Sequence, residues 1–290
     1  MNPINISTST SVFRWKPAAW LRVNGADAAN FLQGQFTQEL RGLAAGEARY
    51  GLWLSVKGKV LADSFVCRGA EPDEFCIGSY FSPAAVIRDR LESHIIADDV
   101  TIEDVTDAWS GVSLLGESAP APLVGFSFRG RRSREPVMEW VYPRSITAEF
   151  AGAREIDAVE MTRRRIEAGI PAVPVDIGPG DLPNEGGLEA DAISFTKGCY
   201  LGQEVMARLK SMGQVRRRLL RVHGTGAGAP APPAPLFLGA RQVGELRSAI
   251  DDEAGGFLGL AMLSLLHLTP EAALAFAPDA APVVRLIDAP

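Results

Sequence analysis

The chain has 290 residues, of which 47% are hydrophobic and 22% are charged, and its formal net charge is −6. This composition is typical of a soluble globular protein with a large core, and it argues against a protein that coats nucleic acid without sequence preference. No apolar run approaches the roughly 20 residues that span a bilayer. The polar N-terminus lacks the apolar core of a secretory signal. We therefore expect a cytoplasmic protein, although the absence of acidic residues before Asp27 leaves a transit peptide open.

In the first part of the chain, strands and helices alternate. Apolar residues at helical spacing from Phe31 to Leu40 predict a helix after the turn at 24–27. Strands are predicted at 50–56 and 59–67, and Lys57-Gly58 between them indicates a hairpin. A third strand at 74–79, a helix at 83–97, and strands at 101–105 and 112–115 follow.

The middle of the chain is less regular, and the end is rich in strands. A Pro/Ala break at 119–122 precedes a strand at 136–143 and a helix at 156–169 with Ile156, Val159, Arg163 and Ile166 on one stripe. The segment 171–187 is rich in Pro and Gly, and a short helix is predicted at 205–209. Five short strands are predicted at 218–222, 235–238, 242–248, 257–262 and 283–287.

These elements favour an α+β protein of antiparallel sheets with flanking helices and a C-terminal β-barrel. The predicted domains are residues 1–115, residues 116–213 and residues 214–290. The linker-like segment 224–235 is rich in Gly, Ala and Pro and is interpreted as a long loop of the barrel.

The most informative stretch runs from Lys197 to Glu204 and reads KGCYLGQE. A nearby cation lowers the pKa of a thiol and favours the reactive thiolate, so Lys197 and Cys199 are the predicted reactive groups. Cys67 and Cys76 lie beside phenylalanines in predicted strands, and we interpret them as buried small hydrophobes. No CxxC pair exists and the three histidines are dispersed, so the chain is predicted to bind no metal or iron–sulfur cluster of its own.

Two further carboxylates are candidates for the site. Glu167 near a helix end is solvated, or it is paired with a nearby arginine such as Arg163 or Arg164, or it recognises the paired N–H donors of a pterin edge. Asp63 on the hairpin is either a general base or cation partner, or a surface strand residue. Gln203 and Glu204 either bind ligand or anchor the loop.

Arginines gather in three groups, each of which could simply be a solvated face. Together they suggest a positive zone that attracts a polyglutamate tail, an RNA backbone or an acidic protein surface, although no RNA-binding motif supports RNA. Their members are Arg129, Arg131, Arg132 and Arg134; Arg163, Arg164 and Arg165; and Arg216, Arg217, Arg218 and Arg221.

The octapeptide resembles the signature of the YgfZ family of folate-binding proteins, which includes a mitochondrial iron–sulfur assembly factor. The resemblance covers nearly the whole chain, including the early helix around Phe31 to Gln35, the turn Lys57-Gly58-Lys59, and the segments 165–171, 175–177, 182–185 and 193–195. The family is similar in fold to the T-protein of the glycine cleavage system, a tetrahydrofolate-dependent aminomethyltransferase. The resemblance implies three domains around a central folate channel.

The T-protein comparison bears on the chemistry. Its Arg-x-Glu-Ala-Gly segment supplies a carboxylate to the pterin, which implies that role for Glu167. The hairpin of the T-protein carries consecutive aspartates, whereas this chain has Ala62-Asp63. The T-protein also has no cysteine in the segment equivalent to the octapeptide. Both departures put aminomethyl transfer by this chain in doubt.

The resemblance implies a cytosolic protein that binds tetrahydrofolate or a one-carbon derivative and supports assembly or repair of iron–sulfur clusters in client enzymes, including tRNA-modifying enzymes. Glu167, Tyr200, Gln203, Glu204 and Asp63 are the predicted cofactor residues. One alternative is a one-carbon transferase with Asp63 as acid/base. Another is a non-catalytic adaptor that docks clients or RNA through arginine faces.

Overall fold

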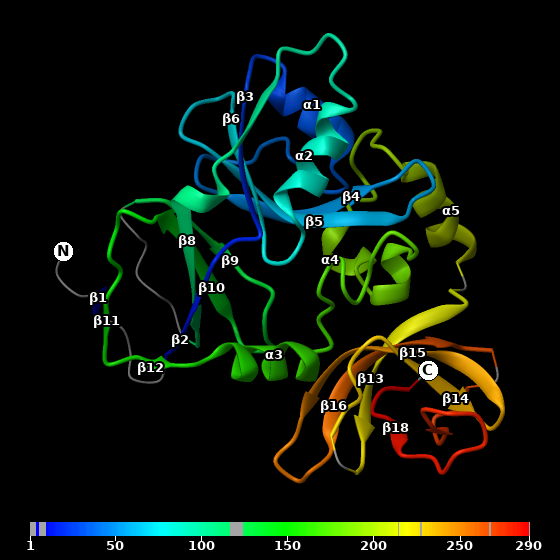
Figure 1. Cartoon of the computed structure of the whole chain (residues 1–290). Coiled ribbons are helices and arrows are strands. Elements are labelled where there is room, and N and C mark those ends of the chain that lie inside the picture. The colour runs from blue at the N-terminus through cyan, green and yellow to red at the C-terminus, as the bar shows by residue number, and fades with distance from the viewer. Residues whose placement is uncertain are drawn as a thin grey trace.

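The computed structural model describes residues 4–5, 10–116, 124–213, 215–226, 228–266 and 268–289. Its helices are short and most of its strand pairs are antiparallel, which confirms the predicted α+β class. Figure 1 shows three lobes: one sheet with α1 and α2 at the top, a second sheet at the left, and a barrel at the lower right. The predicted break at 119–122 lies outside the described residues.

The first sheet has the strand order β4-β5-β6-β3-β7. Its strands are β3 (Ala19–Asn24), β4 (Ala48–Leu54), β5 (Val60–Arg68), β6 (Glu74–Ser79) and β7 (Thr101–Asp104). Helices α1 (Ala28–Gln35) and α2 (Ala84–Glu92) pack on one face through a core that includes Leu21, Phe31, Trp53 and Ile87. The predicted hairpin is confirmed, and Gly58 in its turn has a φ of 70°, which favours glycine.

The second sheet has the order β12-β2-β8-β10-β9. Its strands are β2 (Ser11–Trp15), β8 (Trp109–Leu115), β9 (Phe126–Arg129), β10 (Val137–Pro143) and β12 (Arg154–Glu155), and β1 (Ile4–Asn5) pairs separately with β11 (Phe150–Ala151). The 3-10 turn η1 (Thr106–Ala108) precedes β8. This sheet takes strands from both sides of the predicted boundary at 115/116, and that domain division stays a prediction. Trp20 and Phe65 of the first sheet pack against Phe128 and Val141 of the second.

Helix α3 (Ala158–Glu167) lies between the second sheet and the barrel (Figure 1). Asp157 caps it by accepting a hydrogen bond from the backbone N–H of Glu160 at 2.8 Å. The predicted stripe is wrong at Val159, which is 57% exposed, because the buried face runs through Met161, Arg165 and Ile166. Arg165 is accommodated there by a buried ion pair, which a hydrophobic pattern does not reveal.

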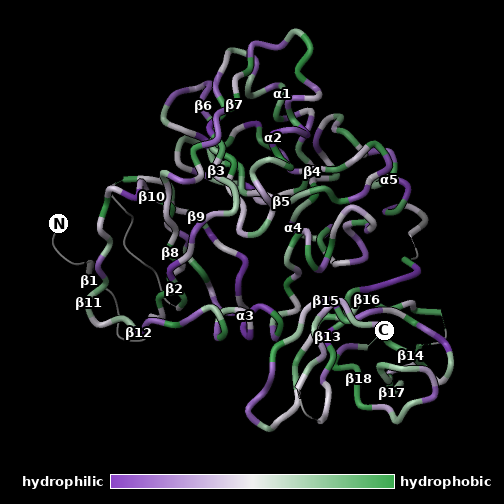
Figure 2. Tube along the Cα trace, in the orientation of Figure 1, coloured by the Kyte–Doolittle hydropathy of each residue, from purple (hydrophilic) through white to green (hydrophobic). Residues whose placement is uncertain are grey.

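The C-terminal barrel contains the five predicted strands and one that was not predicted. They are β13 (Arg217–Gly224), β14 (Ala234–Leu238), β15 (Arg241–Asp251), β16 (Phe257–Ser264), β17 (Ala273–Leu274) and β18 (Val284–Leu286), in the order β14-β15-β16-β13-β18-β17. Phe237 and Ala275 exchange backbone hydrogen bonds of 2.8 and 2.9 Å, which brings the two ends of the sheet together. Figure 2 colours the arginine-rich start of β13 as hydrophilic.

The segment between α3 and the barrel joins the lobes. It holds η2 (Pro183–Gly186), α4 (Glu189–Ala192) and α5 (Gln203–Met212), so the helix predicted at 205–209 exists but is longer. Its apolar side chains pack against Leu52, Leu54 and Val60 of the first sheet. None of the helices in the described ranges is long and apolar enough to cross a bilayer.

Candidate functional site

Lys197, at the start of the octapeptide, is directed toward the end of α1. The side chain is 6% exposed, and its Nζ donates to the backbone carbonyls of Gln33, Phe36 and Gln38 at 2.8, 2.6 and 2.9 Å. Burial lowers the pKa of this ammonium to about 8. These three carbonyls account for all three N–H donors of the ammonium, so its contacts are structural ones.

The octapeptide caps the C-terminus of α1, whose last carbonyls have no partner within the helix. The backbone N–H of Leu201 donates to the carbonyl of Gly34 at 3.2 Å, beside the Lys197 contact with Gln33. The last turn of α1 has no basic residue of its own, and Lys197 supplies a cation there from a distant part of the chain. This arrangement fixes the backbone on both sides of Cys199.

Cys199 itself is exposed, whereas Cys67 and Cys76 are buried as predicted. Its neighbour Tyr200 is 6% exposed and packs in the core below the loop, and its hydroxyl has no hydrogen-bond partner among the described residues. Burial raises the pKa of Tyr200 to about 12. The thiol is thus held at the surface of a rigid loop, and Tyr200 contributes packing to that loop.

Gln203 and Glu204 form the first turn of α5, directly after Gly202 in the left-handed region with a φ of 87°. A Cβ at Gly202 would lie 2.9 Å from the carbonyl oxygen of Ser55, so glycine permits close contact with the β4–β5 hairpin turn. The side chain of Glu204 is 87% exposed and pairs with Arg208 at 2.9 Å. The choice between loop anchors and ligand groups, left open by the sequence, stays a prediction for both residues.

Asp63 is buried, at 4% exposure, so the interpretation as a surface strand residue is wrong. Its carboxylate accepts hydrogen bonds from the hydroxyls of Ser82, Ser79 and Tyr50, at 2.7, 2.8 and 3.0 Å. Burial raises the pKa of Asp63 from its ordinary value, and these hydroxyls oppose that rise. Ser79 at the end of β6 and Ser82 just before α2 lie beside Asp63 and bury it, which the sequence of β5 alone does not reveal.

Tyr50 connects this buried carboxylate to a surface pocket of about 520 Å³. The Arg131 guanidinium lies 4.2 Å from the centroid of the Tyr50 ring, and its Nε donates to Asp191 at 2.8 Å. Tyr50, Arg131 and Asp191 line the pocket, whereas Asp63 does not. A ligand in this pocket would meet the Tyr50 ring and the Arg131 cation, with Asp63 acting only through Tyr50.

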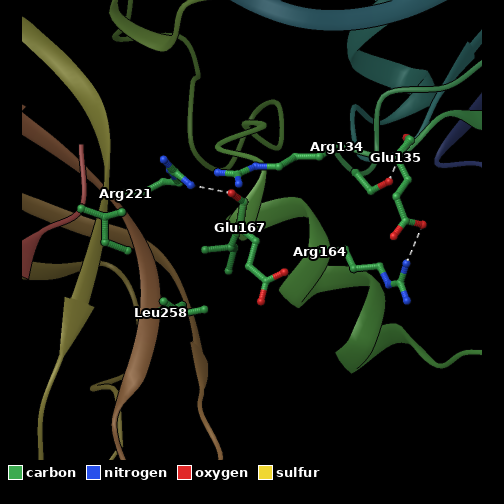
Figure 3. A pocket seen from close by; sticks show the side chains of 9 residues that line it. Arg134, Glu135, Arg164, Glu167, Arg221 and Leu258 are labelled. Atoms are coloured by element: carbon green, nitrogen blue, oxygen red, sulfur yellow. Dashed lines mark hydrogen bonds and ion pairs between the residues drawn. The ribbon is translucent and has the colours of Figure 1, made fainter. Parts of the chain in front are cut away.

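Glu167 ends α3 and lines another pocket, of about 300 Å³. Its side chain is exposed and makes no ion pair or side-chain hydrogen bond with any described residue, while its backbone carbonyl accepts a 2.7 Å hydrogen bond from Arg221. Figure 3 shows the Glu167 carboxylate pointing into the space between α3 and Leu258. Ile166, Leu258 and Ile287 give this pocket an apolar wall.

A third pocket, of about 420 Å³, shares Arg134 and Arg221 with the Glu167 pocket and Arg131 and Ile170 with the Tyr50 pocket. We call the three together the groove. Cys199 lines none of these pockets. The structure therefore separates the predicted site residues. Glu167 lines the groove, and Asp63 lies beneath its Tyr50 wall. Lys197 to Glu204 lie apart from both, between the end of α1 and the start of α5.

Two arginines from the predicted positive zone are not solvated. Arg165 donates to Asp176 at 2.6 Å and to the carbonyl of Ile170, and both side chains of this ion pair are buried. Arg132 is 5% exposed and lies 3.7 Å from the ring centroid of Tyr80. Neither arginine lines the groove, but Arg165 holds the backbone of Ile170, which does.

The partner of Arg132 is Glu139, which sequence reasoning missed. Glu139 is fully buried and accepts hydrogen bonds from Tyr80, Ser113 and Trp15, at 2.7, 2.7 and 3.1 Å. Arg132 Nε lies 3.3 Å from Glu139 Oε1, but the two are not aligned as a hydrogen bond. Burial raises the pKa of Glu139, and Arg132 opposes this rise. The isolated glutamate in a hydrophobic strand was the only available signal.

In the described part of the chain, His, Cys, Asp and Glu side chains form no cluster of three or more that could hold a metal ion. The charged groups that line the groove are carboxylates, which accept hydrogen bonds, and guanidinium groups, which donate them. That set suits an organic ligand with both N–H donors and anionic groups.

Comparison with known families covers most of the chain in two pieces. Residues 5–130 match the GCVT N-terminal domain, and residues 216–286 match the CAF17 C-terminal β-barrel domain. The first match contains the whole first sheet together with β2, β8 and β9 of the second sheet, and the second match contains the six strands of the barrel.

Curated relatives align over most of the chain. The mitochondrial iron–sulfur cluster assembly factor IBA57 of Mus musculus is 32% identical over 79% of this chain and 69% of its own length. The chain belongs to the IBA57/YgfZ family. The Homo sapiens IBA57 is 31% identical over 87% of this chain and 76% of its own length. The tRNA-modifying protein YgfZ of Sodalis glossinidius is 28% identical over 88% of this chain and 87% of its own length.

Among solved structures, the glycine cleavage system aminomethyltransferase T of Bartonella henselae superposes with a TM-score of 0.75 over 96% of this chain and 85% of that protein. The identity is 15%, so this match establishes a shared fold and says nothing of shared chemistry. The resemblance to the YgfZ family and to the T-protein fold is therefore confirmed. Members of the family carry names that place it in iron–sulfur cluster assembly and tRNA modification.

Proposed function

We propose that this protein binds tetrahydrofolate, or a one-carbon derivative, in the groove and thereby supports assembly or repair of iron–sulfur clusters in cytosolic client enzymes, including tRNA-modifying enzymes. The observation that carries the folate part is the Glu167 carboxylate, which pairs with none of the described residues and lies beside an apolar wall. A pterin edge presents a ring N–H and an exocyclic amine, which match two carboxylate oxygens. Ile166, Leu258 and Ile287 would contact the ring faces.

The dimensions and charges of the groove support this proposal. The Glu167 pocket, at about 300 Å³, lies at the lower end of the size range of small-molecule sites, and it continues into the third pocket. Bound tetrahydrofolate would supply a reduced pterin able to carry a one-carbon unit. The protein would hold the pterin edge at Glu167 and attract the anionic end of the ligand with the neighbouring arginines.

Cys199 is the proposed reactive group toward clients. The Lys197 and Leu201 contacts hold its loop, and the thiol is exposed to an approaching protein. In thiol–disulfide exchange, its thiolate would bond to one sulfur of a disulfide and release the other as a thiolate. Because Cys199 lines none of the three pockets, this step would occur on the client-facing surface of the loop.

Neither alternative gains a specific observation. Aminomethyl transfer needs an acid/base at the substrate, but Asp63 is buried beneath Tyr50 and the neighbouring position is Ala62. The adaptor hypothesis depends on a free arginine face. Arg217 is paired with Glu185 and Asp181, and the exposed Arg134 and Arg218 line the groove, where a small anionic ligand could bind them as well as a client could. Folate binding with support of clusters is the function we retain.

A calorimetric titration of tetrahydrofolate into the wild type and into Glu167→Gln tests the folate part. The amide offers one acceptor and adds a donor that opposes the pterin amine, so we expect affinity to fall about 10- to 100-fold. Glu155→Gln is the matched control, because its exposed carboxylate pairs with Arg14 outside the groove. Equal affinities for wild type and Glu167→Gln would contradict the assignment of Glu167.

A further inference from the structure

The groove extends beyond Glu167 into the third pocket, which has about 420 Å³ of space. The C-terminal end of α3, the residues around η2 and the first strand of the barrel line it. Arg134 and Arg221 line both this pocket and the Glu167 pocket, so the two spaces meet at these arginines. Figure 3 draws the Arg134 side chain reaching toward Arg221.

The four arginines that line the third pocket differ in how they are paired. Arg131 forms an ion pair with Asp191 at 2.8 Å. Arg221 forms one with Asp288, and Arg221 Nε lies 3.0 Å from Asp288 Oδ1. Arg134 and Arg218 are exposed and make no ion pair with any residue in the described ranges. These two guanidinium groups remain available to bind an anion from the pocket.

The same pocket contains two acceptors without donors. Asn184 Oδ1 and Glu189 Oε2 are shielded from solvent and have no hydrogen-bond partner among the described residues. Burial raises the pKa of Glu189, and Arg218 opposes this rise. Buried acceptors are normally satisfied, and these two oxygens are therefore able to accept hydrogen bonds from N–H donors of a ligand in the pocket.

We propose that the third pocket binds the γ-linked glutamate chain of a polyglutamylated folate, with the pterin at Glu167. The inference rests on the proposed function and extends it to a preference for chain length. Each added glutamate brings a carboxylate for Arg134 or Arg218, and each γ-link brings an amide N–H for Asn184 or Glu189. A nucleic-acid backbone would satisfy the arginines, but it would place further anionic oxygens against the two unpartnered acceptors.

The test compares tetrahydrofolate carrying one glutamate with tetrahydrofolate carrying five, by calorimetry at low ionic strength. In the wild type we expect the pentaglutamate to bind roughly tenfold more tightly, because charge-assisted contacts are added. Arg218→Gln should reduce that ratio to about twofold, and Asn184→Ala should reduce it in part. Arg216→Gln is the matched control, because Arg216 is exposed near Arg218 but does not line the pocket, and it should keep the full ratio.

A γ-linked pentaglutamate peptide without a pterin separates this inference from the proposed function. Arg218-dependent binding of the peptide supports the pocket assignment even if the monoglutamate folate fails to bind. Tight monoglutamate binding with no gain for the pentaglutamate overturns the inference and leaves the proposed function standing. A short single-stranded RNA that binds through Arg218, while the peptide does not, also overturns it and reassigns the pocket to phosphate.

Discussion

The groove beside α3 and the loop that carries Cys199 use their charged groups in opposite ways. In the loop, the Lys197 ammonium is occupied by three backbone carbonyls, and Tyr200 is packed in the core. In the groove, Glu167 and two of the arginines have no partner among the described residues. The comparison indicates that the contacts of the loop hold the Cys199 thiol in place, whereas the free charged groups of the groove are suited to bind a ligand.

The two regions also differ in the contacts that support them from inside the protein. The residues that line the groove are supported by internal ion pairs, namely Arg132 with Glu139 and Arg165 with Asp176. The loop is supported by a cap on α1 formed from residues far apart in the chain. Removing a support should damage stability, whereas removing an exposed functional group should not. The changes at three positions that follow run from the largest expected loss of stability to the smallest.

Lys197→Met should be the most destabilising of these changes. It leaves the carbonyls of Gln33, Phe36 and Gln38 without a donor and removes the cation at the end of α1, a loss of about 3–5 kcal/mol of unfolding free energy. Urea unfolding below the folded pKa of about 8 measures this loss with the ammonium protonated. The control, Lys57→Met in the exposed hairpin turn, should change stability by less than about 0.5 kcal/mol. Equal urea midpoints for Lys197→Met and wild type would refute the capping role.

Asp63→Ala should cost less, about 2–4 kcal/mol, because it leaves the hydroxyls of Ser79, Ser82 and Tyr50 without their common acceptor. Asp63→Asn keeps one acceptor oxygen and should cost about 1 kcal/mol. Urea unfolding of both variants at a single pH distinguishes them. If alanine and asparagine were equally tolerated, the hydroxyl network would have no role in stability.

The pH dependence of Asp63→Asn sharpens this prediction. Because burial raises the folded pKa of Asp63 above its ordinary value of 3.8, the folded state binds the proton more tightly than the unfolded state. The contribution of this group to stability is therefore present at low pH and lost as the pH rises through the folded pKa. Asparagine does not ionise, so its cost relative to wild type should shrink from pH 4 to pH 7. A cost that grows with pH would mean that the hydroxyl donors outweigh burial.

Local patterns predicted the elements well where neighbours in sequence decide the structure. The β4–β5 hairpin follows from Lys57-Gly58, and the strands of the barrel follow from their short apolar runs. Patterns failed where distant residues decide: α1 ends at Gln35 although apolar spacing continues to Leu40, because the chain turns away there and Lys197 and Leu201 cap it.

The residues of the candidate site show the same difference between local patterns and distant contacts. The unusual combination of residue types in the octapeptide predicted Cys199 as a functional thiol. The structure shows this thiol exposed, and its reactive role stays a prediction. Asp63 is accommodated by Ser79 and Ser82, and Glu139 is accommodated by hydrogen bonds from Trp15, Tyr80 and Ser113, which lie on the other side of the predicted domain boundary. Such contacts require the sheet topology, which no periodicity in one segment contains.

Cys199→Ala should produce the smallest change in stability and the largest change in function. Cys199 is exposed, so its replacement should alter the unfolding free energy by less than about 0.5 kcal/mol. Support of a client can be measured as the activity of an iron–sulfur enzyme in cells that lack their own family member and carry each variant. We expect Cys199→Ala to abolish that support while folate binding in the groove remains, because the thiol lines none of the pockets.

The matched control is Cys76→Ala, which removes a buried thiol, lowers stability modestly and should leave client support intact. Full client support by Cys199→Ala would exclude the thiol from the mechanism. The groove would then be the remaining candidate for the functional site. Loss of support with folate binding retained would instead show that the two regions act in separate steps. The rigid loop would then serve the client, and the open groove would serve the cofactor.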